Sequence, residues 1–202
     1  MASVPASRPR LSSADLLKDL SVHKIDRDKY PIVAVGYRGY YLNSMGKPGV
    51  NDIGDFDDAF ILHTPNVMMS CNGNTDPTAR GYGRAHLRPG FWPMWKLDLH
   101  RGKYLAFCQR AAECEVYRDG TAHLPVGTQN DFGLHMGNGI WRGWFGINGH
   151  KAGATTSSLG CQTVPAQQWP ALIATAEAEA RRFAGAKWRS LVIPYVLIEK
   201  AR

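Results

Sequence analysis

Short apolar runs separated by turn residues occupy the middle of the chain. Runs rich in β-branched and aromatic residues cover 31–41, 59–64, 66–70, 103–109 and 114–119, with Gly, Pro, Asn and Asp between them. Runs of this length and composition are typical of β-strands. We therefore expect them to form the strands of one antiparallel sheet system.

Near each end of the chain the apolar residues follow a helical period instead. Toward the C-terminus this spacing continues until Gly185, and the run 190–200 then predicts a buried closing strand. Near the N-terminus, Ser12 or Ser13 is placed to cap a short helix through Leu20, and residues 1–10 are expected to fray. The apolar faces predicted for these two helices are Leu16, Leu17 and Leu20 for the first and Trp169, Leu172, Ile173, Ala176, Ala180 and Phe183 for the second.

The connection 72–103 is longer than most loops of a compact domain. It contains a turn signal at 72–77 and an aromatic segment, Phe-Trp-Pro-Met-Trp, at 91–95. Such a connection often forms a lid, a cleft wall or a small separate core. We predict that 91–95 borders a cleft, and the alternative is that its rings cover one end of a barrel or sandwich.

Composition supports a β-rich, single-domain protein. The chain has 202 residues, including 21 Gly and 12 Pro, which suits many turns between short elements. We expect an N-terminal extension with a short helix at 1–29 and one domain at 30–202. Four cysteines match no small disulfide framework. Cys108 and Cys114 are the only pair considered for a bridge, and the alternative is that both are buried thiols.

The net charge of +7 favours an anionic partner, such as nucleic acid, an acidic lipid surface or a bacterial cell-wall polymer. The Lys and Arg residues are scattered, and the chain has neither a Lys/Arg-rich run nor the Cys and His spacing of a zinc finger, so we do not expect nucleic-acid binding. The chain has neither the apolar stretch of a signal peptide nor one long enough to span a membrane. We expect a monomer without a membrane span.

The segment 141–165 carries the clearest chemical signal. A thiol attacks a carbonyl as the thiolate, so a nucleophilic cysteine needs a nearby base or positive charge. His150 precedes Cys161 across a loop of small residues, which can fold back to bring the two side chains together. The backbone near Gly160 and Cys161 is a candidate oxyanion hole, and Ser158 is placed to hydrogen-bond the loop or the substrate.

These residues resemble the catalytic motif of the L,D-transpeptidase (YkuD-like) family, in which a His-Gly segment is followed by Ser-x-Gly-Cys. Here the motif is His150 and then Ser158-Leu159-Gly160-Cys161. The resemblance implies an α+β, mainly β sandwich or barrel, with Cys161 as acyl-accepting nucleophile and His150 as its base. Gln162 stands where the family has an apolar residue. We group it with Gly149, Ser158 and Gly160 as candidate substrate or oxyanion residues.

His135 is a further candidate catalytic residue, because a third group often orients the catalytic base. Its alternative role is that of a half-buried strand residue. A metal site built from His135, His150 and Cys161 is another alternative, although no pair of histidines has the spacing of a known zinc motif. We expect no cofactor and no metal.

A rival site consists of carboxylates. Asp57 and Asp58 belong to the acidic segment 51–60, and Glu113 is a further candidate. Paired carboxylates can hydrolyse a glycosidic bond by acid–base catalysis. The alternative is that the acidic segment forms a turn before the strand at 59–64.

The function that we expect on this basis is modification of bacterial peptidoglycan through an acyl-enzyme on Cys161, as a peptidase or transpeptidase. The absence of a signal peptide favours a bacteriolytic protein that is made in the cytoplasm and reaches the wall by host lysis, a phage holin or a secretion system. A muramidase-like glycosidase and a non-catalytic phage structural or wall-binding module are the alternatives.

Overall fold

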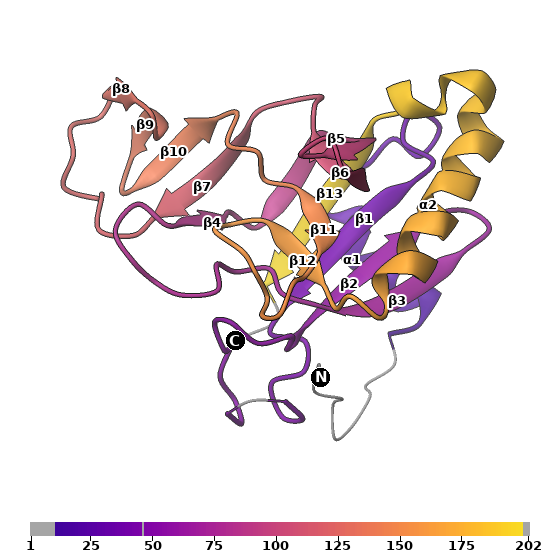
Figure 1. Ribbon diagram of the computed structural model, residues 1–202, viewed down its shortest axis with the longest axis horizontal. Helices are drawn as coiled ribbons and strands as arrows, with labels where there is room; N and C mark the ends of the chain where they lie inside the picture. Colours follow the sequence, from indigo (N-terminus) through magenta and orange to yellow (C-terminus); the bar gives the residue numbers. More distant parts are fainter. Residues whose placement is uncertain (1–10, 46, 200–202) are drawn as a thin grey trace.

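The computed structural model describes residues 11–45 and 47–199, and the expected fraying of residues 1–10 lies outside them. The described chain forms two β-sheets and one long helix, together with a short α-helix and a short 3-10 helix (Figure 1). The mainly β, α+β class with a long C-terminal helix and a closing strand is confirmed.

The larger sheet has eight strands and is almost closed into a barrel. Its order is β12-β11-β6-β5-β13-β1-β2-β3. Just after β3, the backbone of Asn74 exchanges hydrogen bonds of 2.8 and 2.9 Å with Thr163 of β12, so the two ends of the sheet meet. The strands of this sheet are β1 (Val33–Arg38), β2 (Asp58–His63), β3 (Met68–Gly73), β5 (Gly90–His100), β6 (Tyr104–Gln109), β11 (Gly149–Lys151), β12 (Gln162–Val164) and β13 (Ile193–Glu199).

The smaller sheet has five antiparallel strands and projects to one side of the barrel, on the left of Figure 1. Its order is β4-β7-β10-β9-β8. The strands are β4 (Ala85–Leu87), β7 (Cys114–Arg118), β8 (Gln129–Asn130), β9 (Gly133–Gly137) and β10 (Ile140–Gly143).

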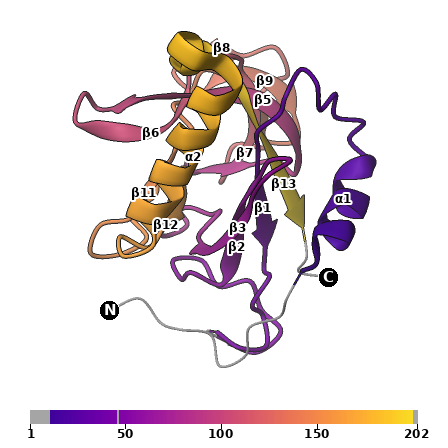
Figure 2. The same cartoon turned by 90° about the vertical axis from the view of Figure 1, so that its right-hand side faces the viewer.

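Two cores stabilise the larger sheet. Inside the barrel, large rings pack on one another, and those of Trp95 and Tyr195 have centroids 4.4 Å apart. Helix α2 (Trp169–Ala184) joins this core through Trp169 and Leu172, and the short 3-10 helix η1 (Gly185–Ser190) follows it. A second core lies under helix α1 (Ser13–Ser21). The two α-helices flank the sheet in Figure 2. Burying one large apolar side chain contributes roughly 1.5–3 kcal/mol.

Several sequence predictions hold at the level of single elements. Each predicted strand overlaps an observed one, α2 ends at Gly185 as expected, and Ser12 caps α1 by accepting a hydrogen bond of 3.1 Å from the backbone of Asp15. In α1, Leu16 and Leu20 are buried, whereas Leu17 is 47% exposed. Residues four apart share a helix face, and Leu17 lies about 100° away from Leu16.

The predictions of how the strands pair and of where the segment 91–95 lies were wrong. The strands form two sheets, and β1 pairs with β13, and β11 with β12, in parallel. The segment 91–95 is neither a cleft border nor a cover over one end. It belongs to the long central strand β5, where Met94 and Trp95 are fully buried. Cys108 and Cys114 are free, buried thiols, so of the two readings of this pair the one without a bridge is confirmed.

Candidate active site

A tight turn carries the candidate nucleophile. The Ser158 hydroxyl donates to the backbone oxygen of Cys161 at 2.7 Å and accepts from the Gly160 amide at 2.9 Å. Gly160 has a φ of +140°, and a Cβ there would lie 2.6 Å from the carbonyl oxygen of Ala85. The turn therefore needs glycine at this position, and buried Ser158 braces it from within.

Cys161 is the only cysteine that is partly exposed, because Cys71, Cys108 and Cys114 are buried. Its Sγ lies 3.4 Å from the backbone oxygen of Gly146. Burial raises the pKa of the Cys161 thiol, and a backbone hydrogen bond from Asn148 with the charge of Arg101 offsets part of that rise. The resting side chain is therefore a neutral thiol, and it needs a base to become a thiolate.

His150, on the short strand β11, has the properties of such a base. Its Nδ1 lies 2.8 Å from the backbone oxygen of Lys151, which can only accept a hydrogen bond. Nδ1 must therefore carry the proton, and the lone pair lies on Nε2. Burial lowers the pKa of His150, so its imidazole is neutral and able to take up a proton near neutral pH.

The register of β11 and β12 gives the direction of the residues next to Cys161 and His150. Gly149 and Gln162 are register partners on β11 and β12, and both face the barrel interior, Gly149 toward Trp95 and Gln162 toward Tyr195. Successive side chains on a strand point to opposite faces. His150 follows Gly149 on β11 and therefore points to the outer face, and Cys161 lies in the turn one residue before β12.

A second histidine lies directly against the candidate base. The rings of His100 and His150 stack with centroids 4.5 Å apart and planes inclined by 24°. Asn148 connects this stack to the core, because its Oδ1 accepts from the backbone N–H of Gln109 at 2.8 Å and its Nδ2 lies 3.2 Å from Nδ1 of His100. The Gln109 bond fixes the orientation of the amide, so Nδ1 of His100 is the acceptor.

The sequence interpretation singled out neither His100 nor Asn148. The two are 48 residues apart in the chain and meet because the hairpin of β5 and β6 pairs with β11. Burial, together with the nearby charge of His150, lowers the pKa of His100 to about 4. His100 is therefore neutral across the range in which His150 would exchange a proton.

Cys161 lines an open groove of about 400 Å³. The groove lies between the loop before β4, the end of β7, the segment after β10 and the Ser158–Cys161 turn. Among its lining residues, Arg84 and Arg118 are the only charged ones, and Phe145 and Leu159 supply apolar surface. A substrate placed here reaches the thiol from the side of the smaller sheet.

Two of the four predicted substrate or oxyanion residues, Gln162 and Gly149, face the barrel interior. The Gln162 side chain accepts a hydrogen bond of 2.8 Å from the Tyr195 hydroxyl and donates one of 3.0 Å to the backbone oxygen of Gly160. Gln162 is fully buried, so it supports the turn from the barrel interior and does not face the groove. Gly149 gives Trp95 and Phe107 room, since a Cβ there would lie 3.1 and 3.3 Å from their rings.

The structure does not bring His135 to the site. This residue lies on β9 in the smaller sheet, is 1% exposed and stacks on Trp141 with ring centroids 4.6 Å apart. Its Nδ1 donates to the backbone oxygen of Pro125 at 2.9 Å, and its Nε2 accepts from the Gly139 amide at 3.2 Å. Both nitrogens are therefore engaged in local structure, and the prediction that His135 orients His150 is wrong.

The rival carboxylates also lie apart from the groove. Asp57 and Asp58 are each 1% exposed, and both oxygens of Asp58 accept backbone hydrogen bonds, from Gly39 at 2.5 Å and Thr75 at 2.6 Å. Burial raises the pKa of both carboxyl groups, with Asp55 and Asp76 as the main like-charged neighbours of Asp57. Glu113 is exposed just before β7, on the smaller sheet. These three residues do not form a pair on one cleft.

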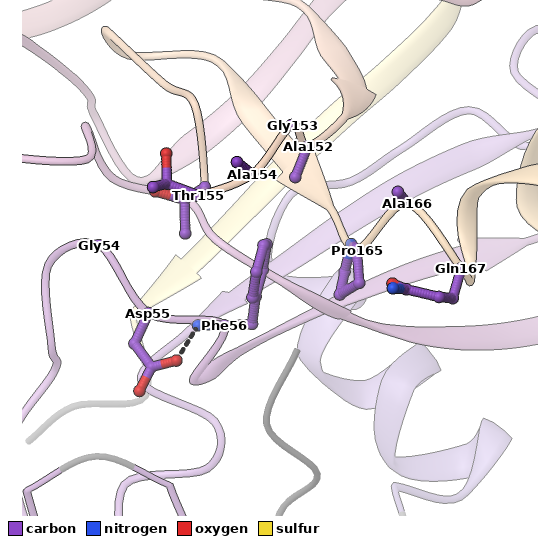
Figure 3. A pocket seen from close by; sticks show the side chains of 11 residues that line it. Gly54, Asp55, Phe56, Ala152, Gly153, Ala154, Thr155, Pro165, Ala166 and Gln167 are labelled. Atoms are coloured by element: carbon purple, nitrogen blue, oxygen red, sulfur yellow. Dashed lines mark hydrogen bonds between the residues drawn. The ribbon is translucent and has the colours of Figure 1, made fainter. Parts of the chain in front are cut away.

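A second hollow of about 370 Å³ lies beside the loop that joins β11 to β12 (Figure 3). Its lining contains small residues, Phe56 and the carboxylate of Asp55, which accepts a hydrogen bond of 2.8 Å from the Phe56 amide. It has neither a cysteine nor a histidine. The groove at Cys161 is therefore the better candidate for thiol chemistry.

Within residues 11–45 and 47–199, no group of three or more His, Cys, Asp and Glu side chains is arranged to hold a metal ion. In the same part of the chain, no helix is both long and apolar enough to cross a bilayer. No family model, curated protein or solved structure matches this chain.

Proposed function

We propose that this protein is a cysteine-dependent acyl-transfer enzyme that acts on a stem-peptide amide of bacterial peptidoglycan. The observation that carries the proposal is the partly exposed Cys161 on its Ser158-braced turn, directly before the strand β12 that pairs with β11. We propose that His150 of β11, whose Nδ1 is bound to the Lys151 carbonyl so that Nε2 keeps the lone pair, is its base. The Ser-x-Gly-Cys resemblance to L,D-transpeptidases supplies the substrate class.

In the proposed reaction, Nε2 of His150 takes the proton of the Cys161 thiol as the thiolate attacks the substrate carbonyl carbon. The new S–C bond moves the carbonyl electron pair onto oxygen. The Gly160 amide is already bound to Ser158. We assign the oxyanion to the Cys161 amide, the backbone N–H of the nucleophile itself.

Collapse of the tetrahedral intermediate breaks the C–N bond, and the leaving amine takes the proton from the His150 imidazolium. A thioester on Cys161 remains. Water resolves it in a peptidase and a second amine resolves it in a transpeptidase, with His150 accepting the proton of the incoming nucleophile in either case. Because burial raises the pKa of the thiol and lowers that of the imidazole, proton transfer accompanies attack and no ion pair exists at rest.

A cell-wall substrate also suits the charge of the chain, since +7 attracts an anionic polymer. We propose a bacteriolytic role for a monomer that reaches the wall after lysis, through a holin or through a secretion system. The muramidase-like alternative has less support, because Asp57 and Asp58 are buried and Glu113 lies on the other sheet.

The test is digestion of purified peptidoglycan followed by mass spectrometry of the released muropeptides. We expect the wild type to cleave or exchange an amide, and Cys161→Ala and His150→Ala to lose that activity. Cys71→Ala, which removes a buried thiol, is the matched control and should remain active. Cleavage of a glycosidic bond, or full activity of Cys161→Ala, would contradict the proposal. Absence of any turnover by the wild type would favour a non-catalytic wall-binding module.

A further inference from the structure

Arg118, at the end of β7, has an unusual environment for a charged side chain. Its guanidinium lies between two rings, with Cζ 4.8 Å from the centroid of Phe132 and 4.7 Å from that of Phe145. Its Nη1 donates to the backbone oxygen of Gly83 at 2.8 Å, while Nε is buried with no hydrogen-bond partner. The rings hold the guanidinium in place, and part of its donor capacity is unused.

The charge of Arg118 is not balanced by a carboxylate. Within residues 11–45 and 47–199, no Asp or Glu forms an ion pair with it. The two nearest acidic residues in sequence are already paired, Asp119 with Arg80 and His86, and Glu115 with Arg88 and Arg142. Burial lowers the pKa of Arg118, yet an arginine keeps its proton at any physiological pH.

Arg118 and Cys161 line the same groove, together with Arg84. None of the described residues that line this groove is acidic, so two cations face it without an internal anion. Phe145 and the 66% exposed Leu159 add an apolar wall. A half-buried guanidinium without a counter-ion binds a planar carboxylate well, because its fork of N–H donors matches the two oxygens.

We propose that the groove is a carboxylate subsite, in which Arg118, with Arg84 beside it, binds a free carboxylate of the peptide whose amide is attacked by Cys161. This inference rests on the proposed function and names the group that the substrate must carry. It also assigns substrate recognition to β7 of the smaller sheet, since Gln162, directly after the nucleophile, is buried and turned away from the groove.

The test measures binding without turnover. In the Cys161→Ala background, calorimetric titration compares a free stem tetrapeptide, with all its carboxylates ionised, against versions in which each carboxylate is amidated singly. We expect one of these amidations to weaken binding about tenfold to a hundredfold, which is the usual effect of losing one hydrogen-bonded charge pair. Higher salt should weaken the free acid more than its amide.

Arginine variants identify the side chain responsible. Arg118→Gln should reduce affinity for the acid to that for the amide and leave the amide unaffected, and Arg118→Lys should retain part of the difference. Arg142→Gln, which removes an equal charge from an exposed position on the same sheet, is the control and should bind as the parent does. Circular dichroism checks the fold, and Arg84→Gln, at the other cation of the groove, provides a second variant if Arg118→Gln fails to fold.

Three outcomes would overturn the subsite and leave Arg118 as a packing residue. They are equal affinity for acid and amide, no binding of the acid at millimolar concentration, and an equal loss of affinity for both peptides in Arg118→Gln. Failure of the catalytic proposal appears elsewhere, as the absence of a thioester on wild-type Cys161 in the mass spectrum of the peptide-treated protein. The two results are therefore independent.

Discussion

The imidazole of His100 stacks on that of His150 with 4.5 Å between ring centroids, and the side chain of Asn148 holds His100 through its Nδ1. The stack covers one face of the proposed base and limits its rotation, while the Lys151 carbonyl fixes its proton on Nδ1. His100 itself stays neutral because burial lowers its pKa to about 4. We infer that His100 is a positioning residue for His150.

Replacement of His100 should therefore slow catalysis without abolishing it. We expect His100→Ala to lower kcat about tenfold to a hundredfold, because small displacements of a catalytic group are costly. His100→Phe keeps a ring against His150 and should recover part of the loss. Steady-state kinetics on muropeptides measure both, and the exposed His123→Ala serves as control.

The pH profile separates positioning from a general loss of stability. Burial lowers the pKa of His150, so the acid limb of kcat/KM in the wild type should lie below pH 6.5, the ordinary value for histidine. Loss of the stacked ring exposes the His150 imidazole to water, so the acid limb should move to higher pH in His100→Ala. An unchanged limb with a normal rate would show that the stack has no role in catalysis.

Local patterns in the sequence predicted the elements that local chemistry determines. Short β-branched and aromatic runs located β1, β2, β3, β6, β7 and β13, and the helical period located α1 and α2. The parallel pairing of β1 with β13 joins opposite ends of the domain, and no local sequence pattern indicates it. The segment 91–95 suggested a cleft border because it is aromatic and lies between turns, yet the barrel interior takes the same kind of side chain.

The same distinction applies to the site. Ser158, Gly160 and Cys161 are close in sequence, so a motif could predict their turn. His100 and Arg118 reach the site from β5 and β7, and only the three-dimensional pairing of strands reveals them. Gln162 was misinterpreted because a polar residue beside a nucleophile suggests substrate contact, whereas here it satisfies buried polar groups of the barrel.

Alkylation should distinguish the cysteines. Burial raises the pKa of Cys71 and Cys114 to about 12 and that of Cys108 to about 11, and all three are inaccessible in the fold. We expect iodoacetamide to modify Cys161 first under native conditions, at a rate that increases with pH through the raised pKa of its thiol. Peptide mapping by mass spectrometry gives the order, and guanidinium chloride should make all four react. Native modification of Cys108 ahead of Cys161 would contradict the assigned accessibility.

Gln162→Ala tests the structural role of that side chain. The substitution leaves the Tyr195 hydroxyl and the carbonyl of Gly160 without their partner in a buried environment. Each unsatisfied buried group costs about 1–3 kcal/mol, so we expect the free energy of unfolding to fall by roughly 2–4 kcal/mol. Urea denaturation measures the change, with the exposed Gln167→Ala as matched control. Equal stability of the two variants would mean that the barrel does not depend on this network.

Asp57→Asn tests both the pH dependence of stability and the glycosidase alternative. Burial raises the pKa of Asp57 from 3.8 to about 7, and its Oδ1 is buried without a hydrogen-bond partner. Between about pH 4 and 7 the folded protein then holds a proton that the unfolded chain has released, so its stability falls as pH rises through this window. Asparagine cannot ionise and avoids that loss.

We therefore expect Asp57→Asn to match the wild type near pH 3 and to exceed it at pH 8 by about 1–3 kcal/mol in the free energy of unfolding. Urea denaturation across the pH range measures the difference, and the exposed Asp28→Asn should show none. The variant should keep its amide chemistry on peptidoglycan, because the thiol proposal gives Asp57 no catalytic part. Loss of activity in a stabilised Asp57→Asn protein would instead favour carboxylate chemistry and remove the case for Cys161.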